Sequence, residues 1–303
     1  MLPLPRTAYE APDTVDEAVR LAAEPGARVL AGGTDLVPSM KHRLFQPSVL
    51  VSTRRLADLH RVDFFPGGLS VGAAVTLRDL ARNTDIQASY PALAAACRSV
   101  ATPTIQGMAT LGGNVMLDTR CVYYNQPSGW RAALGGCLKC EGTLCHVAPK
   151  GVGCYAAHSA DTVTVLSLLG AVAVFATPQS QQSVPVATLY GTDGRDWIRA
   201  PAGALLTHVE LPPPGAPIAY RKLRQRAAID YGLLLTAVQR REDGFHAVIS
   251  AIGPSPIAVS APTAEALVEA AHYAVQPLAT HLPSVIWRKK MVRIEVRRAL
   301  DTL

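Results

Sequence analysis

The sequence lacks any apolar run long enough to cross a lipid bilayer, and no stretch of its 303 residues repeats another. It opens with Met-Leu-Pro-Leu-Pro-Arg-Thr, which has neither the charged n-region nor the apolar core of an export signal. Its 49% content of hydrophobic residues is typical of a globular protein. We therefore expect a cytoplasmic protein of two or three domains with no membrane association.

The sequence also lacks a concentrated basic surface, although its formal net charge is +6. Lys and Arg are dispersed except near the end, where they recur at helical spacing in segments 288–293 and 297–298. A nucleic-acid-binding protein gathers such residues into a patch or stripe. We interpret the C-terminal group as the solvated or subunit-facing side of a helix, and we expect no nucleic-acid partner.

Neither of the common nucleotide-binding signatures, G-x-G-x-x-G and the P-loop, is present. Instead, the loop Gly32-Gly33-Thr34-Asp35 follows a predicted strand over 28–31. Paired glycines let backbone amides approach a ligand closely, and inward-turned amides bind phosphate oxygens. Alone, such a turn is most often structural. A second glycine pair within 110–115 changes this interpretation, because two such loops can close over the two halves of a dinucleotide.

A third polar group, Ser159 and Asp161, precedes the apolar segment 163–171. This position places polar side chains at the mouth of a predicted buried element. An ordinary helix N-cap explains it equally well. Only its combination with the two glycine loops favours a binding site.

Cysteine is scarce outside one window, because five of the six cysteines lie between Cys121 and Cys154. The window is rich in Gly, Tyr and Pro, which is typical of a loop-rich insertion. Cys97, in an apolar stretch, is predicted to be a buried small hydrophobe. Disulfides belong to exported proteins and are disfavoured here. The Cys137-x-x-Cys140 pair favours structural zinc, but no second close pair completes that pattern, whereas an iron–sulfur cluster needs only four converging thiolates. Zinc and a cluster both stay open.

The segments 31–36, 109–115 and 159–161, in this order, resemble the FAD-binding medium subunits of molybdenum hydroxylases, the xanthine dehydrogenase and carbon monoxide dehydrogenase group. The resemblance continues past the proline-rich connector 210–217, through 220–231 and 286–300. It implies an α+β fold. A two-lobed FAD-binding domain over 1–215 is interrupted by a cysteine-rich iron–sulfur insertion over 118–157, and a smaller C-terminal α/β domain covers 216–303.

The resemblance implies that the first glycine loop contacts the FAD pyrophosphate and that the second forms the opposite wall. Asp161 would bind a ribityl or sugar hydroxyl, and Lys222 would lie near the pyrimidine edge of the flavin. Tyr190 would shield a ring face, although an aromatic residue after an apolar strand is commonly plain packing. The cofactor-binding residues expected are Leu30, Ala31, Gly32, Gly33, Thr34, Asp35, Leu36, Thr110, Gly113, Asn114, Asp161, Tyr190 and Lys222.

In most members of this family the second glycine loop runs quickly into the Ser-x-Asp segment, whereas here about forty residues intervene. The insertion is similar to that of the 4-hydroxybenzoyl-CoA reductase branch, in which it binds a [4Fe–4S] cluster. The resemblance places the four ligands at Cys121, Cys137, Cys145 and Cys154. It leaves Cys140 spare, against the local C-x-x-C spacing.

The expected role is that of an electron-transfer subunit without a substrate site. By the same resemblance, the partners are a molybdenum-cofactor large subunit and a [2Fe–2S] small subunit, assembled as a dimer of heterotrimers. Electrons would pass from ferredoxin through the [4Fe–4S] cluster and FAD to molybdenum, for reductive dehydroxylation to benzoyl-CoA. Two alternatives stay open: a flavin subunit that passes electrons outward from a related hydroxylase, and a zinc-stapled scaffold that is not an enzyme.

Overall fold

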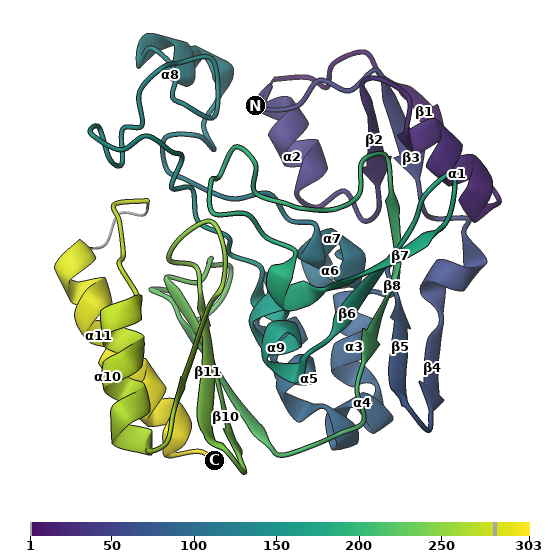
Figure 1. Ribbon diagram of the computed structural model, residues 1–303. Coiled ribbons are helices and arrows are strands. Elements are labelled where there is room, and N and C mark those ends of the chain that lie inside the picture. The colour runs from purple at the N-terminus through teal and green to yellow at the C-terminus, as the bar shows by residue number, and fades with distance from the viewer. Residues whose placement is uncertain (1, 281–283) are drawn as a thin grey trace.

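The computed structural model describes residues 2–280 and 284–303, and Figure 1 shows them arranged around three sheets. The first sheet is parallel, with the strand order β1 (Ala8–Glu10), β3 (Val49–Ser52) and β2 (Ala27–Leu30). Helix α1 (Val15–Ala22) begins after Thr14, whose hydroxyl accepts a hydrogen bond from the Glu17 amide at 3.2 Å and so caps the helix. The first glycine loop then joins β2 to α2 (Leu36–Lys41).

The second sheet is antiparallel and has five strands. Their order is β4 (Val62–Phe65), β5 (Gly68–Gly72), β8 (Leu205–Leu211), β6 (Val172–Ala176) and β7 (Gln181–Pro185). The short 3₁₀ turns η1 (Ala57–His60) and η2 (Val186–Thr188) flank it. The helices that share an apolar core with it are α3 (Leu77–Arg82), α4 (Thr84–Ser89), α5 (Pro91–Ser99), α7 (Leu111–Val115) and α9 (Asp161–Leu169). Helix α6 (Pro103–Gln106) packs against α3 and α5, and α1 contacts β6 and β8.

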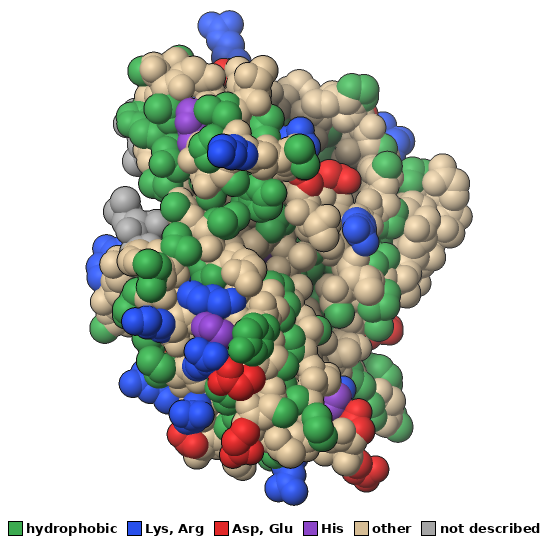
Figure 2. Space-filling view, turned by 60° about the vertical axis from the view of Figure 1, so that its left-hand side comes forward, with side chains coloured by type: hydrophobic (Ala, Val, Ile, Leu, Met, Phe, Trp, Pro, Cys, Tyr) green, Lys and Arg blue, Asp and Glu red, His purple; other side chains and the backbone are tan. Residues whose placement is uncertain are grey.

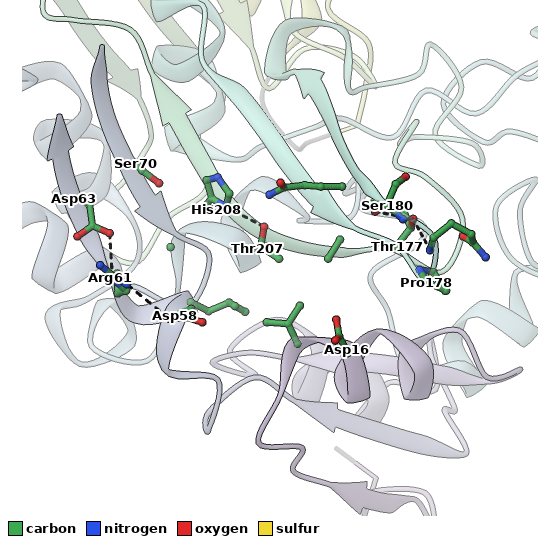
Figure 3. A pocket seen from close by; sticks show the side chains of 16 residues that line it. Asp16, Asp58, Arg61, Asp63, Ser70, Thr177, Pro178, Ser180, Thr207 and His208 are labelled. Carbon is green, nitrogen blue, oxygen red and sulfur yellow. Dashed lines mark hydrogen bonds and ion pairs between the residues drawn. The ribbon is translucent and has the colours of Figure 1, made fainter. Parts of the chain in front are cut away.

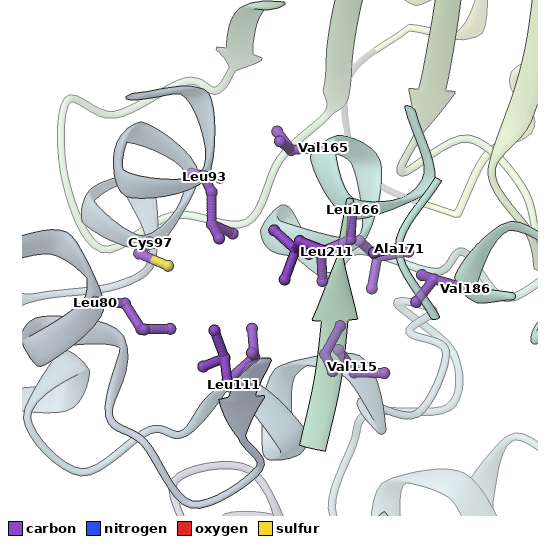
Figure 4. Close-up of a cluster of buried hydrophobic side chains, with 14 of the residues drawn as sticks. Leu80, Leu93, Cys97, Leu111, Val115, Val165, Leu166, Ala171, Val186 and Leu211 are labelled. Atoms are coloured by element: carbon purple, nitrogen blue, oxygen red, sulfur yellow. The ribbon is translucent and has the colours of Figure 1, made fainter. Parts of the chain in front are cut away.

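The largest apolar core lies between this sheet and its helices, and Figure 4 shows part of it. Leu93, Leu166 and Leu211 come from α5, α9 and β8 and meet there with no exposed surface or almost none. Cys97 is fully buried in the same core, which confirms that it is a small hydrophobe. Burial raises the pKa of its thiol to about 12, so it stays protonated and apolar.

The third sheet is antiparallel, with the order β12 (Ile257–Ala261), β11 (Gly244–Ser250), β10 (Leu234–Arg241) and β9 (Ile218–Leu223). Val238 and Ala247 point toward a second core with α10 (Ala264–Ala274) and α11 (Val285–Leu300), whereas the adjacent Ala237 and Val248 belong to the first core. Alternation along the strands therefore buries both faces of this sheet. The proline-rich segment 212–217 joins β8 to β9 outside any helix or strand.

The basic residues of α11 follow the prediction of a solvated helix side at Lys290, Arg297 and Arg298, which are exposed, but not at Arg288. Arg288 is fully buried and donates hydrogen bonds to the carbonyls of Leu233, Ala251 and Leu278. Arg293 forms a bidentate pair with Glu269 at 2.9 and 2.6 Å. Figure 2 shows Lys and Arg beside Asp and Glu on the face toward these helices, not a uniformly basic surface. Helical spacing alone did not reveal that neighbouring carbonyls bind the Arg288 guanidinium and that Glu269 pairs with Arg293.

The cysteine-rich segment (118–157) contains one described helix, α8 (Ser128–Ala133), and otherwise consists of turns and isolated bridges. Arg120 and Ala157 pair at its base through two backbone hydrogen bonds of 2.8 and 2.7 Å. In Figure 1 it lies at the upper left, apart from the sheets. None of the helices in the described residues has the length and apolarity needed to span a membrane.

Candidate functional site

The two glycine loops face each other across one cavity of about 1150 Å³. They meet at Gly32, where a Cβ atom would lie 1.7 Å from the carbonyl oxygen of Met108. Glycine is therefore required for the loops to approach this closely. A cavity larger than those that hold drug-sized ligands suits a dinucleotide. The predicted residues that line it are Ala31, Gly32, Gly33, Thr34, Asp35, Leu36, Thr110, Gly113, Asn114, Asp161 and Lys222.

The first glycine loop turns through Gly33, whose φ of 70° favours glycine. Asp35 occupies the N-cap position of α2 but makes no side-chain capping bond. Its Oδ1 instead lies 2.5 Å from Nη1 of Arg120, at the base of the cysteine-rich segment. The carboxylate that we predicted to contact FAD is thus already held by a cation from another part of the chain.

The second glycine loop differs from the prediction, because its glycine pair lies within the short helix α7; it forms the opposite wall of the cavity. The Thr110 hydroxyl accepts a hydrogen bond from the Gly113 amide at 3.0 Å and so caps α7. The side-chain oxygen of Asn114 accepts hydrogen bonds from the amide and hydroxyl of Thr162 at 3.2 and 2.7 Å. These bonds use both lone pairs of that oxygen, so only the side-chain nitrogen of Asn114 is left to donate to a ligand.

Asp161 is the centre of a buried polar network. Its Oδ1 lies 2.8 Å from Nζ of Lys222 and accepts hydrogen bonds from the hydroxyls of Ser99 and Tyr220, both at 2.9 Å. The Asp161 and Lys222 side chains are only 7% and 5% exposed. Burial first, and the Asp161 charge second, raise the pKa of Tyr220 well above its ordinary value, so this phenol stays a donor.

The structure does not place Asp161 or Ser159 as a helix cap. Asp161 is the first residue of α9, and its N-cap is Ala160, which makes no side-chain capping bond. Ser159 lines the cavity, and its buried hydroxyl has no hydrogen-bond partner among the described residues.

Two predicted cofactor residues lie away from the cavity lining. Leu30 packs behind the first loop, where its Cδ1 would be 3.2 Å from a Cβ atom on Gly33. Tyr190 is buried, its hydroxyl donates to the Val115 carbonyl at 3.1 Å, and its ring lies 4.2 Å from the His158 ring. Plain packing thus accounts for Tyr190 in the structure.

Sequence reasoning missed several lining residues from other elements. Ala101 and Ile229 both have positive φ, 42° and 54°, and a hydrogen bond of 3.4 Å joins the Ile229 amide to the Ala101 carbonyl. Both residues line the cavity, as do Trp197 and Tyr231. Strained non-glycine residues concentrate at functional sites. The sequence carries no signal for this strain, because neither Ala nor Ile is typical of the left-handed region.

A second, smaller cavity gathers the cysteines. Cys121, Cys137, Cys145 and Cys154 are all buried and all line it, whereas Cys140 is partly exposed and does not. Burial raises the pKa of the Cys121 thiol to about 11 and also raises that of Cys154. These thiols therefore stay protonated at neutral pH unless a bound cation stabilises the thiolate.

The described residues include no group of three or more His, Cys, Asp or Glu side chains placed to hold a metal ion. A tetrahedral zinc ion binds thiolates at about 2.3 Å and draws them tightly together. A cluster holds its four thiolates around a much larger body of iron and sulfide. The cavity that the four thiols line has a volume of about 20 Å³ and does not by itself distinguish zinc from a cluster.

Another hollow lies beside α1, η1 and the turn between β6 and β7, and Figure 3 shows its lining. Arg61 pairs there with Asp63 at 3.2 Å and with Asp58 at 3.9 Å. The Arg61 side chain is 64% exposed, and no predicted site residue lines this hollow. Exposed ion pairs of this kind contribute little to stability, and we assign no function to this hollow.

Comparison with known proteins assigns the class. The family described as "FAD binding domain in molybdopterin dehydrogenase" matches residues 5–214, which is more than half of the chain. The chain therefore belongs to this family. It is an FAD-binding oxidoreductase subunit of the molybdenum hydroxylase family. This membership contradicts the alternative of a scaffold that binds no flavin.

Relatives of this chain are FAD-binding subunits or medium chains of such enzymes. The aldehyde oxidoreductase FAD-binding subunit PaoB of Escherichia coli strain K12 is 34% identical over 248 residues, 78% of this chain and 78% of that protein. The carbon monoxide dehydrogenase medium chain of Hydrogenophaga pseudoflava is 37% identical over 117 residues, 38% of this chain and 40% of that protein.

Solved structures match the whole fold. Quinoline 2-oxidoreductase from Pseudomonas putida 86 aligns with a TM-score of 0.79 at 21% identity, covering 99% of this chain and 98% of that chain. Cu,Mo-CO dehydrogenase in its cyanide-inactivated form aligns with a TM-score of 0.78 at 22% identity, with the same coverage. The predicted mixed fold of the medium-subunit type is confirmed.

Proposed function

We propose that this chain carries a [4Fe–4S] cluster beside its FAD and passes electrons between the two inside a molybdenum enzyme. The observation that supports the cluster is that Cys121, Cys137, Cys145 and Cys154 line one buried cavity. FAD exchanges one or two electrons and a cluster exchanges one, so the pair links one-electron carriers to two-electron chemistry. We also propose the division into an FAD-binding domain (1–215), interrupted by 118–157, and a C-terminal domain (216–303).

The roles proposed for the FAD site follow from the cavity lining. The amides of the first glycine loop donate to the pyrophosphate, because those of 111–114 already donate to acceptors within the protein. The Asn114 side-chain nitrogen supplies a further polar contact. Asp161 fixes the Lys222 ammonium at the cavity wall. A cation held there stabilises negative charge on a reduced flavin. Leu30 and Tyr190 support the walls from behind.

The first candidate for the direction of electron flow is inward, towards molybdenum, as in the 4-hydroxybenzoyl-CoA reductase branch. Ferredoxin would donate to the cluster, and electrons would reach partner [2Fe–2S] and molybdenum centres for reductive dehydroxylation. We propose a molybdenum-cofactor large subunit and a [2Fe–2S] small subunit as partners, in a dimer of heterotrimers. The presence of a thiol-lined cavity in the cysteine-rich segment supports this candidate.

The second candidate sends electrons outward from an aldehyde-oxidising partner subunit. The 34% identity to an aldehyde oxidoreductase FAD-binding subunit over 78% of both chains favours it. The purified complex separates the candidates. Oxidation of an aldehyde with reduction of an external acceptor supports the second, and ferredoxin-dependent conversion of 4-hydroxybenzoyl-CoA to benzoyl-CoA supports the first.

Single cysteine variants of the purified protein test the cluster. Iron and sulfide analysis with electron paramagnetic resonance should show loss of the cluster in the Ser variants of Cys121, Cys137, Cys145 and Cys154, because a serine oxygen is a poor iron ligand. Cys140→Ser is the matched control and should keep it. FAD content should be unchanged in all five. Loss in Cys140→Ser with retention in Cys137→Ser overturns the ligand set, and wild-type protein with FAD but no iron overturns the cluster.

A further inference from the structure

Arg120 lies at the junction between the cysteine-rich segment and the FAD-binding region. Its backbone pairs with that of Ala157, where the segment leaves and re-enters the rest of the fold. It also directly precedes Cys121 in the sequence. The backbone of Arg120 is therefore fixed by the root of the segment, and its side chain is free to reach elsewhere.

The Arg120 side chain contacts two residues that are distant from it, and from each other, in the sequence. Its Nη1 lies 2.5 Å from Oδ1 of Asp35 in the first glycine loop. Its guanidinium carbon lies 4.2 Å from the ring centroid of Tyr231, in the loop between β9 and β10. Asp35 and Tyr231 both line the FAD cavity, whereas Arg120 is not part of the lining. Any influence of Arg120 on FAD therefore acts through these two residues.

The setting gives these contacts more weight than an ordinary surface ion pair. The side chains of Arg120 and Asp35 are 19% and 30% exposed, so water screens them only in part. A guanidinium can pair with a carboxylate and stack on an aromatic ring at the same time, which an ammonium cannot do equally well. Arg120 also neutralises a carboxylate that would otherwise repel a pyrophosphate bound at this loop.

We propose that Arg120 is a positioning residue for FAD, which clamps Asp35 to Tyr231 and so makes FAD retention depend on the root of the cysteine-rich segment. The inference rests on the proposed FAD site. It predicts that a change at Arg120 alters FAD binding through Asp35 and Tyr231, which lie about 85 and 110 residues away in the sequence. Neither the cluster nor the partner subunits are needed for it.

FAD affinity and FAD dissociation rate of the full chain test the clamp. Arg120→Met should weaken FAD binding by roughly tenfold or more, since it removes a charge-assisted hydrogen bond and a cation–π contact. Arg120→Lys keeps the charge but loses the planar stacking, so its FAD affinity should lie between those of the wild type and Arg120→Met. Arg61→Met removes an arginine from exposed ion pairs in the hollow of Figure 3 and should bind FAD as the wild type does.

A double variant identifies the route of the effect. In an Asp35→Asn background, Arg120→Met should cost less FAD affinity than it does in the wild type, because the ion pair is already lost. A purely structural role would lower the unfolding temperature of FAD-free protein and leave FAD affinity unchanged, and that result overturns the proposal. Gly32→Ala distinguishes failure of the Arg120 clamp from failure of the proposed FAD site. If it loses FAD while Arg120→Met does not, the clamp alone is wrong; if it keeps FAD, the site itself is wrong.

Discussion

At the scale of single residues, Gly32 decides how closely the two glycine loops approach. A methyl group there would overlap the Met108 carbonyl oxygen at 1.7 Å, and that oxygen belongs to backbone, which cannot rotate away. The sequence indicated glycine for ligand contact. The structure adds that this glycine is needed for contact between the loops themselves.

Gly32→Ala should therefore separate the loops and yield protein with little FAD. Gly215→Ala is the matched control, because nothing lies within 4 Å of a Cβ atom at that position. FAD extracted per polypeptide measures the effect, and far-ultraviolet circular dichroism verifies folding. Equal FAD content in both variants would contradict the assignment of the loops.

His158 is the second residue whose setting yields a prediction. It has no exposed surface, and neither ring nitrogen has a hydrogen-bond partner among the described residues. Its ring packs against Tyr190, and the Trp197 ring lies 6.5 Å away. Burial lowers the pKa of His158 from 6.5 to about 3, so the ring is neutral in the folded protein.

The folded protein should consequently lose stability in mild acid. Between pH 6.5 and about 3 the unfolded chain protonates this ring and the folded chain does not, so the unfolded state binds more protons and the free energy of unfolding falls as pH falls. The limiting slope is about 1.4 kcal/mol per pH unit. His158→Phe should flatten it, which denaturant unfolding from pH 8 to 4.5 would measure. At pH 8 the His158 ring of the wild type is neutral, as is the Phe ring of the variant. A difference in the free energy of unfolding at that pH therefore reports packing only. Parallel slopes would argue against a buried neutral ring.

At the scale of elements, Lys139 attaches the cysteine-rich segment to the host fold. Its Nζ donates hydrogen bonds to Asp118 Oδ1 at 2.6 Å, Thr119 Oγ1 at 2.5 Å and the Gly194 carbonyl at 2.7 Å. These bonds use all three donors of the ammonium. The Lys139 and Asp118 side chains are only 6% and 14% exposed. The ion pair with Asp118 closes the segment on its own first residue, and the bond to the Gly194 carbonyl joins the segment to the host fold in addition to the backbone bridge.

Lys139→Met should loosen the segment, because it leaves the Asp118 carboxylate buried without its cation. The cost expected is on the order of 3 kcal/mol. Hydrogen exchange of amides in 118–157 should accelerate, while amides of the five-stranded sheet remain protected. Lys150→Met, at an exposed position in the same segment, is the control. Equal exchange in the two variants would show that Lys139 does not anchor the segment.

At the scale of the whole molecule, the Asp161–Lys222 pair joins the two main cores. Asp161 belongs to α9 in the first core, and Lys222 belongs to β9 of the C-terminal sheet. Lys222 also donates to the Ser99 carbonyl at 3.0 Å. The same pair lines the FAD cavity, so cofactor binding and docking of the two parts share one interaction.

Lys222→Met should lower the free energy of unfolding by about 3–5 kcal/mol, the usual cost of leaving one buried charge unpaired. Asp161→Asn combined with Lys222→Met should recover part of that loss, since no charge then remains buried. Denaturant titration of FAD-free protein measures both values. Lys290→Met removes an exposed lysine and should change little. A Lys222→Met effect as small as the control would mean that the two cores are joined by apolar packing alone.

The sequence was sufficient for much of the local structure. Paired glycines after an apolar run depend on neighbours within a few residues, so the strand followed by the first glycine loop was predicted within one or two residues, as β2 and the turn into α2. The grouping of Asp35, Asn114 and Asp161 at one cavity was also expected, although from a family resemblance and not from local pattern.

The tertiary structure alone decided which side chains meet. The burial of Arg288, the pairing of Arg120 with Asp35, the displacement of Tyr190 from the cavity, and the strained Ala101 and Ile229 all involve partners far away in sequence. Composition and spacing specify which groups a chain offers, and they act over a few residues. Packing density and the need to satisfy every buried charge and carbonyl act across the whole fold, so they determine the partners only when the chain is folded.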